Sequence, residues 1–251
     1  MHRAAHACVA TLVFAASAQA NLIPNPGFET GFVGDPFNAG VGLGDIPDPW
    51  TPLANNNHPS TSSPDTHANN GVGGIPVTQT FSSFGNEPFF SNTAIEGNRF
   101  VGAVERPDLF EPFGVELPQR LSPVRDYTFS AQLIASDSIV SGTFNTSFEG
   151  GYEVLLSEDG TLNNAESVAF LPFTGNAFDE WAPVSVEFTS PFRSLQYGTL
   201  ILAPRYTGNS PASRQVHFGI DDLHLDLTPI PEPTTAALLG LTALSLTRRT
   251  K

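Results

Sequence analysis

The chain has 251 residues, with 25 Asp and Glu against 11 Lys and Arg, and a formal net charge of −14. Outside residues 1–20 and 229–251 it holds seven Arg, no Lys and 24 acidic residues. Such an acidic chain repels nucleic acid and anionic membrane surfaces, which argues against both as partners, and it offers oxygen ligands to hard cations.

The N-terminus has the order of a secretory signal peptide. A positively charged start is followed by a stretch of small and apolar residues and then by Ala18-x-Ala20, the small–x–small pattern that signal peptidase requires. We therefore expect cleavage between Ala20 and Asn21, with residues 1–20 as the leader. The one Cys, Cys8, leaves with the leader, so the exported chain must fold without disulfides or thiolate ligands.

Residues 21–228 have the length of one β-sandwich domain and show frequent alternation of apolar and polar residues, with no segment of helical period. Turn-rich Gly, Pro, Asn and Asp separate these segments, which favours an antiparallel sandwich of the jelly-roll kind. The predicted strands cover residues 77–81, 99–104, 127–135, 139–148, 151–156, 168–173, 184–188, 198–203 and 215–227.

A long polar segment, about residues 34–74, interrupts this pattern and is expected to be a loop over one end of the sandwich. It contains Trp50 and the run Asn55, Asn56 and Asn57, which together could stack on and hydrogen-bond to a sugar. The alternative for Trp50 is core packing, the usual role of a large aromatic residue in a sandwich.

The last predicted strand changes its apolar phase in the middle. Phe218 and Ile220 share one parity, whereas Leu223 and the apolar residues after it share the other. The strand must slip by one residue at Asp221-Asp222 to keep its apolar side chains on one face, and a β-bulge provides that slip.

The C-terminal residues 229–251 combine Pro231-Glu232-Pro233, an apolar run over residues 234–247 and the basic pair Arg248-Arg249. The run is shorter than the roughly 17–25 residues of a spanning helix. It therefore predicts a transient stop in the inner membrane, with the basic end held on the cytoplasmic side.

This tail resembles the PEP-CTERM sorting signal. The resemblance implies recognition by an exosortase-type membrane protease after signal peptidase has acted. It also implies passage through the periplasm to the outer surface or extracellular matrix of a Gram-negative bacterium that makes exopolysaccharide.

The body resembles the galactose-binding-like and carbohydrate-binding-module-like jelly rolls, which implies their fold. In those modules a structural calcium often lies where the first and last strands meet. Carried onto this chain, its ligands are Glu29 and Asp221 or Asp222, completed by backbone carbonyls; the alternative is that these carboxylates cap turns. The matching segments, in chain order, are residues 21–31, 97–102, 117–121, 127–130, Trp181 and 219–223.

Sequence motifs of catalysis are missing from the chain: it has no G-x-S-x-G elbow, no H-E-x-x-H helix and no phosphate loop. Together with the sorting tail, this favours a non-catalytic cell-surface or exopolysaccharide-matrix protein. A second hypothesis, compatible with the first, is a module that binds exopolysaccharide or another glycan. The alternative is a polysaccharide hydrolase or lyase on the jelly-roll scaffold.

Overall fold

The computed structural model describes residues 21–31, 46–53, 64–71, 74–78, 89–106, 109–136, 149–193, 196–208 and 216–228. The elements within these ranges are twelve strands and one short 3-10 helix: β1 (Thr51–Pro52), β2 (Asp65–Ala68), β3 (Ile75–Pro76), β4 (Arg99–Arg106), β5 (Leu109–Phe110), β6 (Phe113–Glu116), β7 (Asp126–Ala135), β8 (Gly150–Ser157), η2 (Leu162–Asn164), β9 (Glu166–Pro172), β10 (Ala182–Thr189), β11 (Thr199–Tyr206) and β12 (Val216–Leu227).

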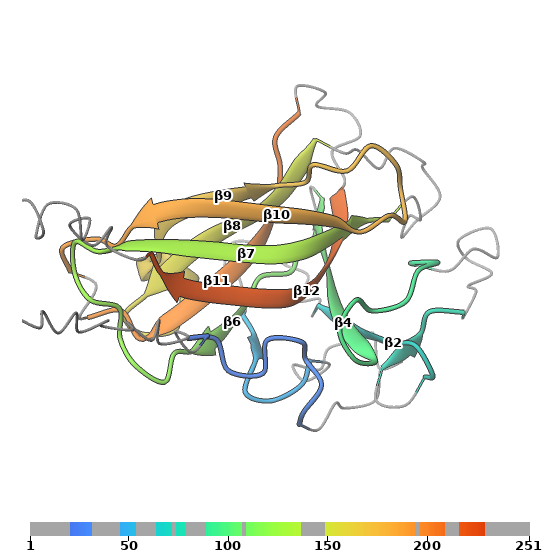
Figure 1. The fold of residues 1–251 in the computed structure, drawn as a ribbon, viewed down its shortest axis with the longest axis horizontal. Coiled ribbons are helices and arrows are strands. Elements are labelled where there is room, and N and C mark those ends of the chain that lie inside the picture. The colour runs from blue at the N-terminus through green and yellow to red at the C-terminus, as the bar shows by residue number, and fades with distance from the viewer. Residues whose placement is uncertain are drawn as a thin grey trace, which may run out of the picture.

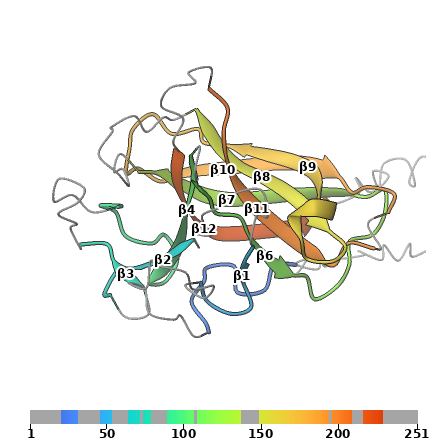
Figure 2. The ribbon, with the colours of Figure 1, turned by 180° about the vertical axis from the view of Figure 1, so that it is seen from behind.

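Two sheets pack face to face, which confirms the predicted all-β jelly-roll sandwich. One sheet has five strands in the order β1-β6-β11-β8-β9, and the other has seven, in the order β10-β7-β12-β4-β2-β3 with β5 paired to β4. The described pairings are antiparallel except that of β2 with β3. Figure 1 shows β10, β7 and β12 side by side in one layer, and Figure 2 shows β8, β11 and β6 of the other from behind.

The core lies between the sheets because each long strand turns alternate apolar side chains inward. In β7, Tyr127, Phe129, Ala131 and Leu133 are buried, whereas the residues between them are partly exposed. A second apolar cluster covers part of the outer face of the seven-stranded sheet, and it includes Phe89, Phe90, Phe100 and Ile134.

Most of the predicted strands are present, namely those that correspond to β4, β7, β8, β9, β10, β11 and β12. Val77 and Thr78 form a turn after β3 instead of beginning the strand predicted at 77–81. The strand predicted at 139–148 lies outside the described residues.

The segment predicted as a loop, residues 34–74, contains β1 and β2. β2 has few apolar residues, yet it pairs with β4 along its whole length, so a partner distant in sequence orders it. Local composition could not reveal this pairing.

No helix among the described residues is long and apolar enough to cross a membrane.

Candidate functional site

A groove lies on the outer face of the seven-stranded sheet, over β10, β7 and β12. Its volume is about 240 Å³. Its polar lining consists of hydroxyl, amide, carboxylate and imidazole side chains, and no Phe, Tyr or Trp is among the lining residues. The polar residues are Ser130, Gln132, Ser185, Asp222 and His224. The rest of the lining is apolar and consists of Ala131, Pro183 and Val184. The groove therefore offers hydrogen bonds beside aliphatic side chains and has no aromatic stacking platform.

The strand register brings these side chains together. Ser130 of β7 lies opposite Ser185 of β10 on one side and opposite His224 of β12 on the other. Residues directly opposite each other in antiparallel strands present their side chains on the same face, with Cβ atoms about 4.5–5.5 Å apart. A polar row thus crosses three strands.

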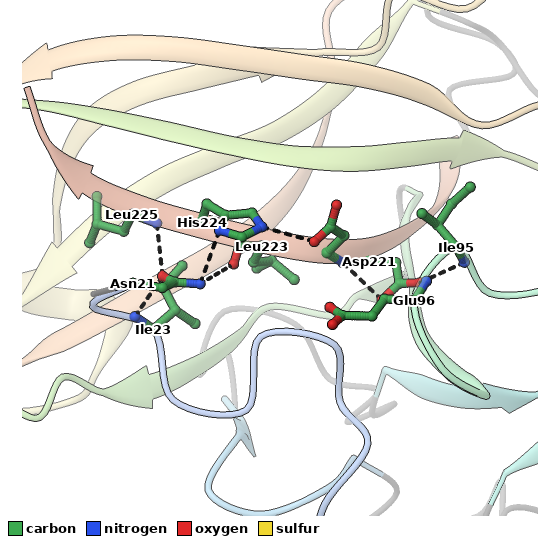
Figure 3. A network of polar contacts seen from close by, with 9 residues as sticks. Asn21, Ile23, Ile95, Glu96, Asp221, Leu223, His224 and Leu225 are labelled. Atoms are coloured by element: carbon green, nitrogen blue, oxygen red, sulfur yellow. Dashed lines mark hydrogen bonds and ion pairs between the residues drawn. The ribbon is translucent and has the colours of Figure 1, made fainter. Parts of the chain in front are cut away.

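His224 is held from both sides at one end of this row. Its Nε2 lies 2.9 Å from Asp222 Oδ1, and its Nδ1 lies 3.4 Å from Asn21 Nδ2 (Figure 3). Asn21 also donates to the Leu223 carbonyl at 2.7 Å and accepts from the Leu225 amide at 3.1 Å. The first described residue is therefore fixed to the last strand, beside the groove.

The predicted β-bulge in the last strand is confirmed. Ile220 and Leu223 are both fully buried, and the register with β7 shifts between Asp221 and His224. Asp222 has a φ of 50°, in the left-handed region, which Asp adopts more readily than most other residues. The bulge points Asp221 and Asp222 to different surroundings.

Asp221 and Glu29 hold the two ends of the turn Ile95–Arg99. Asp221 Oδ2 accepts hydrogen bonds from the first two amides of the turn, at 2.8 and 3.0 Å (Figure 3). Glu29 Oε1 accepts from the last two amides, at 2.6 and 2.7 Å. Gly97 lies between them with a φ of 62°. Two carboxyl groups thus accept hydrogen bonds from four backbone amides, so the turn is held at both ends.

Asp221 is a buried carboxyl with no ion-pair partner among the residues that the structure describes. Its side chain is fully buried, and none of the described Arg or His residues forms an ion pair with it. Burial raises the pKa of Asp221 to about 7, although the amides of Ile95, Glu96 and Asp222 act in the opposite direction. A cation beside it would restore the ionised form.

The expected calcium ligands fit this place in part. Glu29 and Asp221 supply the hard oxygen atoms that calcium prefers, at the meeting point of the first segment and β12. Asp222 instead pairs with His224 at the groove. The described residues contain no group of three or more His, Cys, Asp or Glu that could hold a metal ion, so backbone carbonyls would have to complete the site. Calcium binding stays a prediction.

Trp50 has a structural role, which corrects the sugar-stacking hypothesis. The residue is 1% exposed, and its ring centroid lies 5.2 Å from that of Phe28 and 5.6 Å from that of Phe113. Its Nε1 donates to the Asn25 carbonyl at 3.1 Å. Because the indole is enclosed by the core, it presents no face to a ligand.

The remaining predicted site residues lie outside the described ranges. They are Asn55, Asn56 and Asn57 of the sugar hypothesis, Ala18 and Ala20 of the cleavage site, and Pro231, Glu232, Pro233, Arg248 and Arg249 of the sorting tail. The predictions made for them stay predictions.

Sequence reasoning missed both the groove and the position of His67. Outward polar residues such as Gln132 look the same in a sequence whether they line a groove or face solvent. His67 belongs to the segment predicted as a loop, residues 34–74, but it lies on β2 and is 1% exposed. The close spacing of Phe89, Phe90 and Phe100, which surround it, is a signal that could have raised the question.

Comparison with known proteins gives structural neighbours only. No family model matches the chain, and no curated protein matches it. An apo cyclase from Fischerella sp. is 19% identical with a TM-score of 0.52, and the match covers 86% of this chain and 98% of the cyclase. A cyclase from Fischerella sp. TAU is 16% identical with a TM-score of 0.51, over 84% and 98% of the two chains.

Carbohydrate-binding domains are also among the similar structures. The CBM22-1–GH10 modules of Clostridium thermocellum xylanase 10B, solved with xylohexaose, are 14% identical with a TM-score of 0.44. That match covers 85% of this chain and 29% of the xylanase chain. A TM-score this low is insufficient to transfer a ligand.

The two cyclases correct the expectation of a non-catalytic protein. Both are enzymes on this fold, so the lack of hydrolase and phosphate-loop motifs does not argue against catalysis on such a scaffold. At 16% and 19% identity the likeness establishes the fold and not a reaction.

Proposed function

We propose that this chain is an exported protein that an exosortase-type system sorts to the cell surface or the exopolysaccharide matrix, where its jelly roll binds a glycan. The leader with Ala18 and Ala20 and the tail with Pro231-Glu232-Pro233 motivate the sorting part. The contacts of Asn21 with β12 support it, because the chain enters and leaves the described sandwich at neighbouring points. Cleavage before Asn21 and within the C-terminal tail would therefore leave the domain intact.

The groove is the observation that carries the glycan part. Sugar hydroxyls pair well with the amide of Gln132, the hydroxyl of Ser185 and the carboxylate of Asp222, all of which line it. At about 240 Å³ the groove is smaller than the roughly 300–1,000 Å³ of typical small-molecule pockets. It therefore suits one sugar ring of a polysaccharide. Each ring is bound weakly, and the same polymer offers many such rings.

The sorting part is tested in the producing organism. Mass spectrometry of the surface protein should give an N-terminus at Asn21 and a C-terminus upstream of residue 234. Deletion of the exosortase gene, or the variant Glu232→Ala, should retain the uncut chain in the inner membrane. Unchanged surface delivery in both strains would contradict the proposal.

The glycan part is tested by affinity electrophoresis in gels that contain the producer's own exopolysaccharide. Wild type should be retarded, and Gln132→Ala and Ser185→Ala should each weaken binding several-fold, since each removes hydrogen bonds to the ligand. Glu187→Ala is the control, because this exposed residue lies on the same face of β10 outside the groove. Equal retardation of all four proteins would rule out the groove as the site.

An enzyme acting on the polysaccharide is the second candidate. The Asp222–His224 pair in the groove favours it, because a carboxylate 2.9 Å from an imidazole is a common arrangement for acid–base chemistry. The test is release of reducing ends or unsaturated products from the same exopolysaccharide. Polysaccharide cleavage that His224→Asn abolishes, while glycan binding remains, would establish this candidate. If wild type shows no turnover, glycan binding is the only one of the two functions that is left.

A further inference from the structure

The two most exposed large apolar side chains of the described residues lie on neighbouring turns. Phe192 follows β10 and is 83% exposed, and Val124 precedes β7 and is 62% exposed. Ser190 joins the two turns: its carbonyl accepts from the Val124 amide at 3.2 Å, and its amide donates to the Arg125 carbonyl at 2.8 Å. Its hydroxyl also accepts from the Arg125 amide at 3.1 Å. We call residues 122–125 and 190–193 the apolar turns.

The backbone of Val124 has an unusual conformation. Its φ is 54°, in the left-handed region, where a β-branched residue is a genuine outlier. The strain is not offset by burial, because most of the valine side chain is exposed. Backbone outliers of this kind cluster at functional sites. The exposed valine therefore indicates a contact with something outside the sandwich.

The chain leaves the sandwich beside the apolar turns. The amide of Thr228, just after β12, donates at 2.8 Å to the carbonyl of Asp126, two residues after Val124. Figure 1 shows β10 and β12 ending, and β7 beginning, at this same end of the sandwich. The apolar run of the tail begins at residue 234, and residues 229–233 before it span at most about 20 Å. A tail that stops in the membrane therefore holds the apolar turns near the membrane surface.

Arginines flank the apolar turns, although the body as a whole is strongly acidic. Arg120 and Arg193 are exposed and Arg125 is half-buried, and these are three of the seven Arg in residues 21–228. Long arginine side chains can reach lipid phosphates while apolar neighbours lie deeper in the bilayer. The acidic residues at this end lie on or next to β6, β8 and β9 of the five-stranded sheet, apart from one on β7; they are Glu116, Glu158, Asp159, Glu166 and Asp126.

We propose that the apolar turns rest on the periplasmic surface of the inner membrane, with Phe192 and Val124 inserted among the lipid headgroups. The inference rests on the proposed sorting function and adds that the folded domain itself touches lipid in a fixed orientation. Two apolar side chains bind a bilayer weakly, but a tethered contact forms at a high effective concentration. This orientation keeps Pro231-Glu232-Pro233 at the membrane surface, within reach of a membrane protease.

The test uses the chain from Asn21 to Lys251, which has no Cys, so that one introduced Cys can carry a polarity-sensitive fluorophore. The tail anchors the chain in vesicles of phosphatidylcholine and phosphatidylglycerol in equal parts. Labels at Phe192→Cys and Val124→Cys should shift to shorter wavelength, and headgroup-labelled quencher lipids should quench them several-fold more than the control. The control is Asn176→Cys, an exposed residue between β9 and β10 at the opposite end of the sandwich.

A second measurement uses unlabelled chains with a smaller apolar contact. Phe192→Ser should release the chain from the vesicles about 10-fold faster, because a phenylalanine side chain leaves the lipid. Val124→Asn should also speed release, and it should not melt lower than wild type, because Asn tolerates a positive φ better than Val. Glu187→Ala, a change at an exposed residue away from the turns, should leave the release rate unchanged.

The outcomes separate this proposal from the sorting proposal. A chain that does not associate with vesicles at all would contradict the membrane step of sorting as well as the contact. Association through the tail, with labels at positions 124 and 192 that stay as exposed to water as the label at 176, would overturn the contact alone. Labels that shift only in membranes containing the exosortase would assign the apolar turns to that protease and would also overturn the lipid contact.

Discussion

Glu29 and Asp221 bind opposite ends of one turn, Ile95–Arg99, each through a pair of consecutive amides. One carboxylate comes from the first described segment and the other from the last strand. The turn therefore joins three parts of the chain that are far apart in sequence. Its geometry is over-determined, so small changes within it should have measurable effects on the stability of the whole sandwich.

Gly97→Ala should destabilise the protein by about 1–3 kcal/mol. The added Cβ would lie 2.7 Å from Glu29 Oε2, and the φ of 62° is unfavourable for alanine. Gly198→Ala is the matched control, because nothing lies within 4 Å of its Cβ position and its φ is not in the left-handed region; it should change stability by less than about 0.5 kcal/mol. Urea denaturation of both variants decides the point, and equal midpoints would contradict the tight packing of the turn.

Asp221 should make the protein less stable as the pH rises towards neutrality. Its folded pKa of about 7 lies above the ordinary 3.8, so its contribution is fully present below about pH 3.8 and is lost as the pH rises through about 7. Asp221→Asn stays neutral and should lack this decline. The difference in unfolding free energy between the two proteins, measured in EDTA at several pH values, should change by a few kcal/mol over that range. A constant difference would show that Asp221 ionises normally.

Calcium should reverse this behaviour if it binds as the resemblance implies. An ion at Glu29 and Asp221 would favour the ionised carboxylate and raise the melting temperature, more strongly at about pH 8 than at about pH 5. Glu29→Gln should remove the calcium effect. Isothermal titration of the EDTA-treated protein provides an independent readout, and absence of both heat and thermal shift would eliminate the calcium hypothesis.

His67 and His217 should make the protein sensitive to acid. Their folded pKa values lie below the ordinary 6.5, His217 at about 3, so the stability they support is present above about pH 6.5 and falls as the pH is lowered towards about 3. His217→Phe cannot take up a proton and should flatten this part of the profile. Thermal unfolding of wild type and variant between about pH 6.5 and pH 4, without metal, tests this; parallel profiles would mean that another group controls acid unfolding.

Strand periodicity predicted most of the sandwich because burial in a two-layer fold repeats every second residue. The same logic located the bulge at Asp221-Asp222, where the apolar phase of β12 changes. By contrast, β2 depends on its pairing with β4, and His67 is buried only because that pairing places it beneath Phe90 and Phe100. Contacts between residues far apart in the chain left no local pattern to detect.

The candidate site was harder to predict than the fold for a related reason. The resemblance named Glu29 and Asp221 as candidate ligands. It did not indicate that both residues accept hydrogen bonds from backbone amides of the same turn. The groove is formed by the alignment of Ser130, Ser185 and His224 across three strands. In the sequence, its polar residues look like those of any strand face that is exposed to solvent. Register between strands, which a single sequence does not reveal, determined both features.

Trp50→Ala should destabilise the protein by about 3–5 kcal/mol, because it removes a buried indole and leaves a cavity between Phe28 and Phe113. Phe192→Ala, a change at an aromatic residue that is 83% exposed, should have an effect of less than about 0.5 kcal/mol. Urea denaturation measures both. Where Trp50→Ala is still folded, its retention by exopolysaccharide should equal that of wild type, because the indole faces the core and not the groove. A folded variant that loses retention would restore Trp50 as a sugar-binding residue.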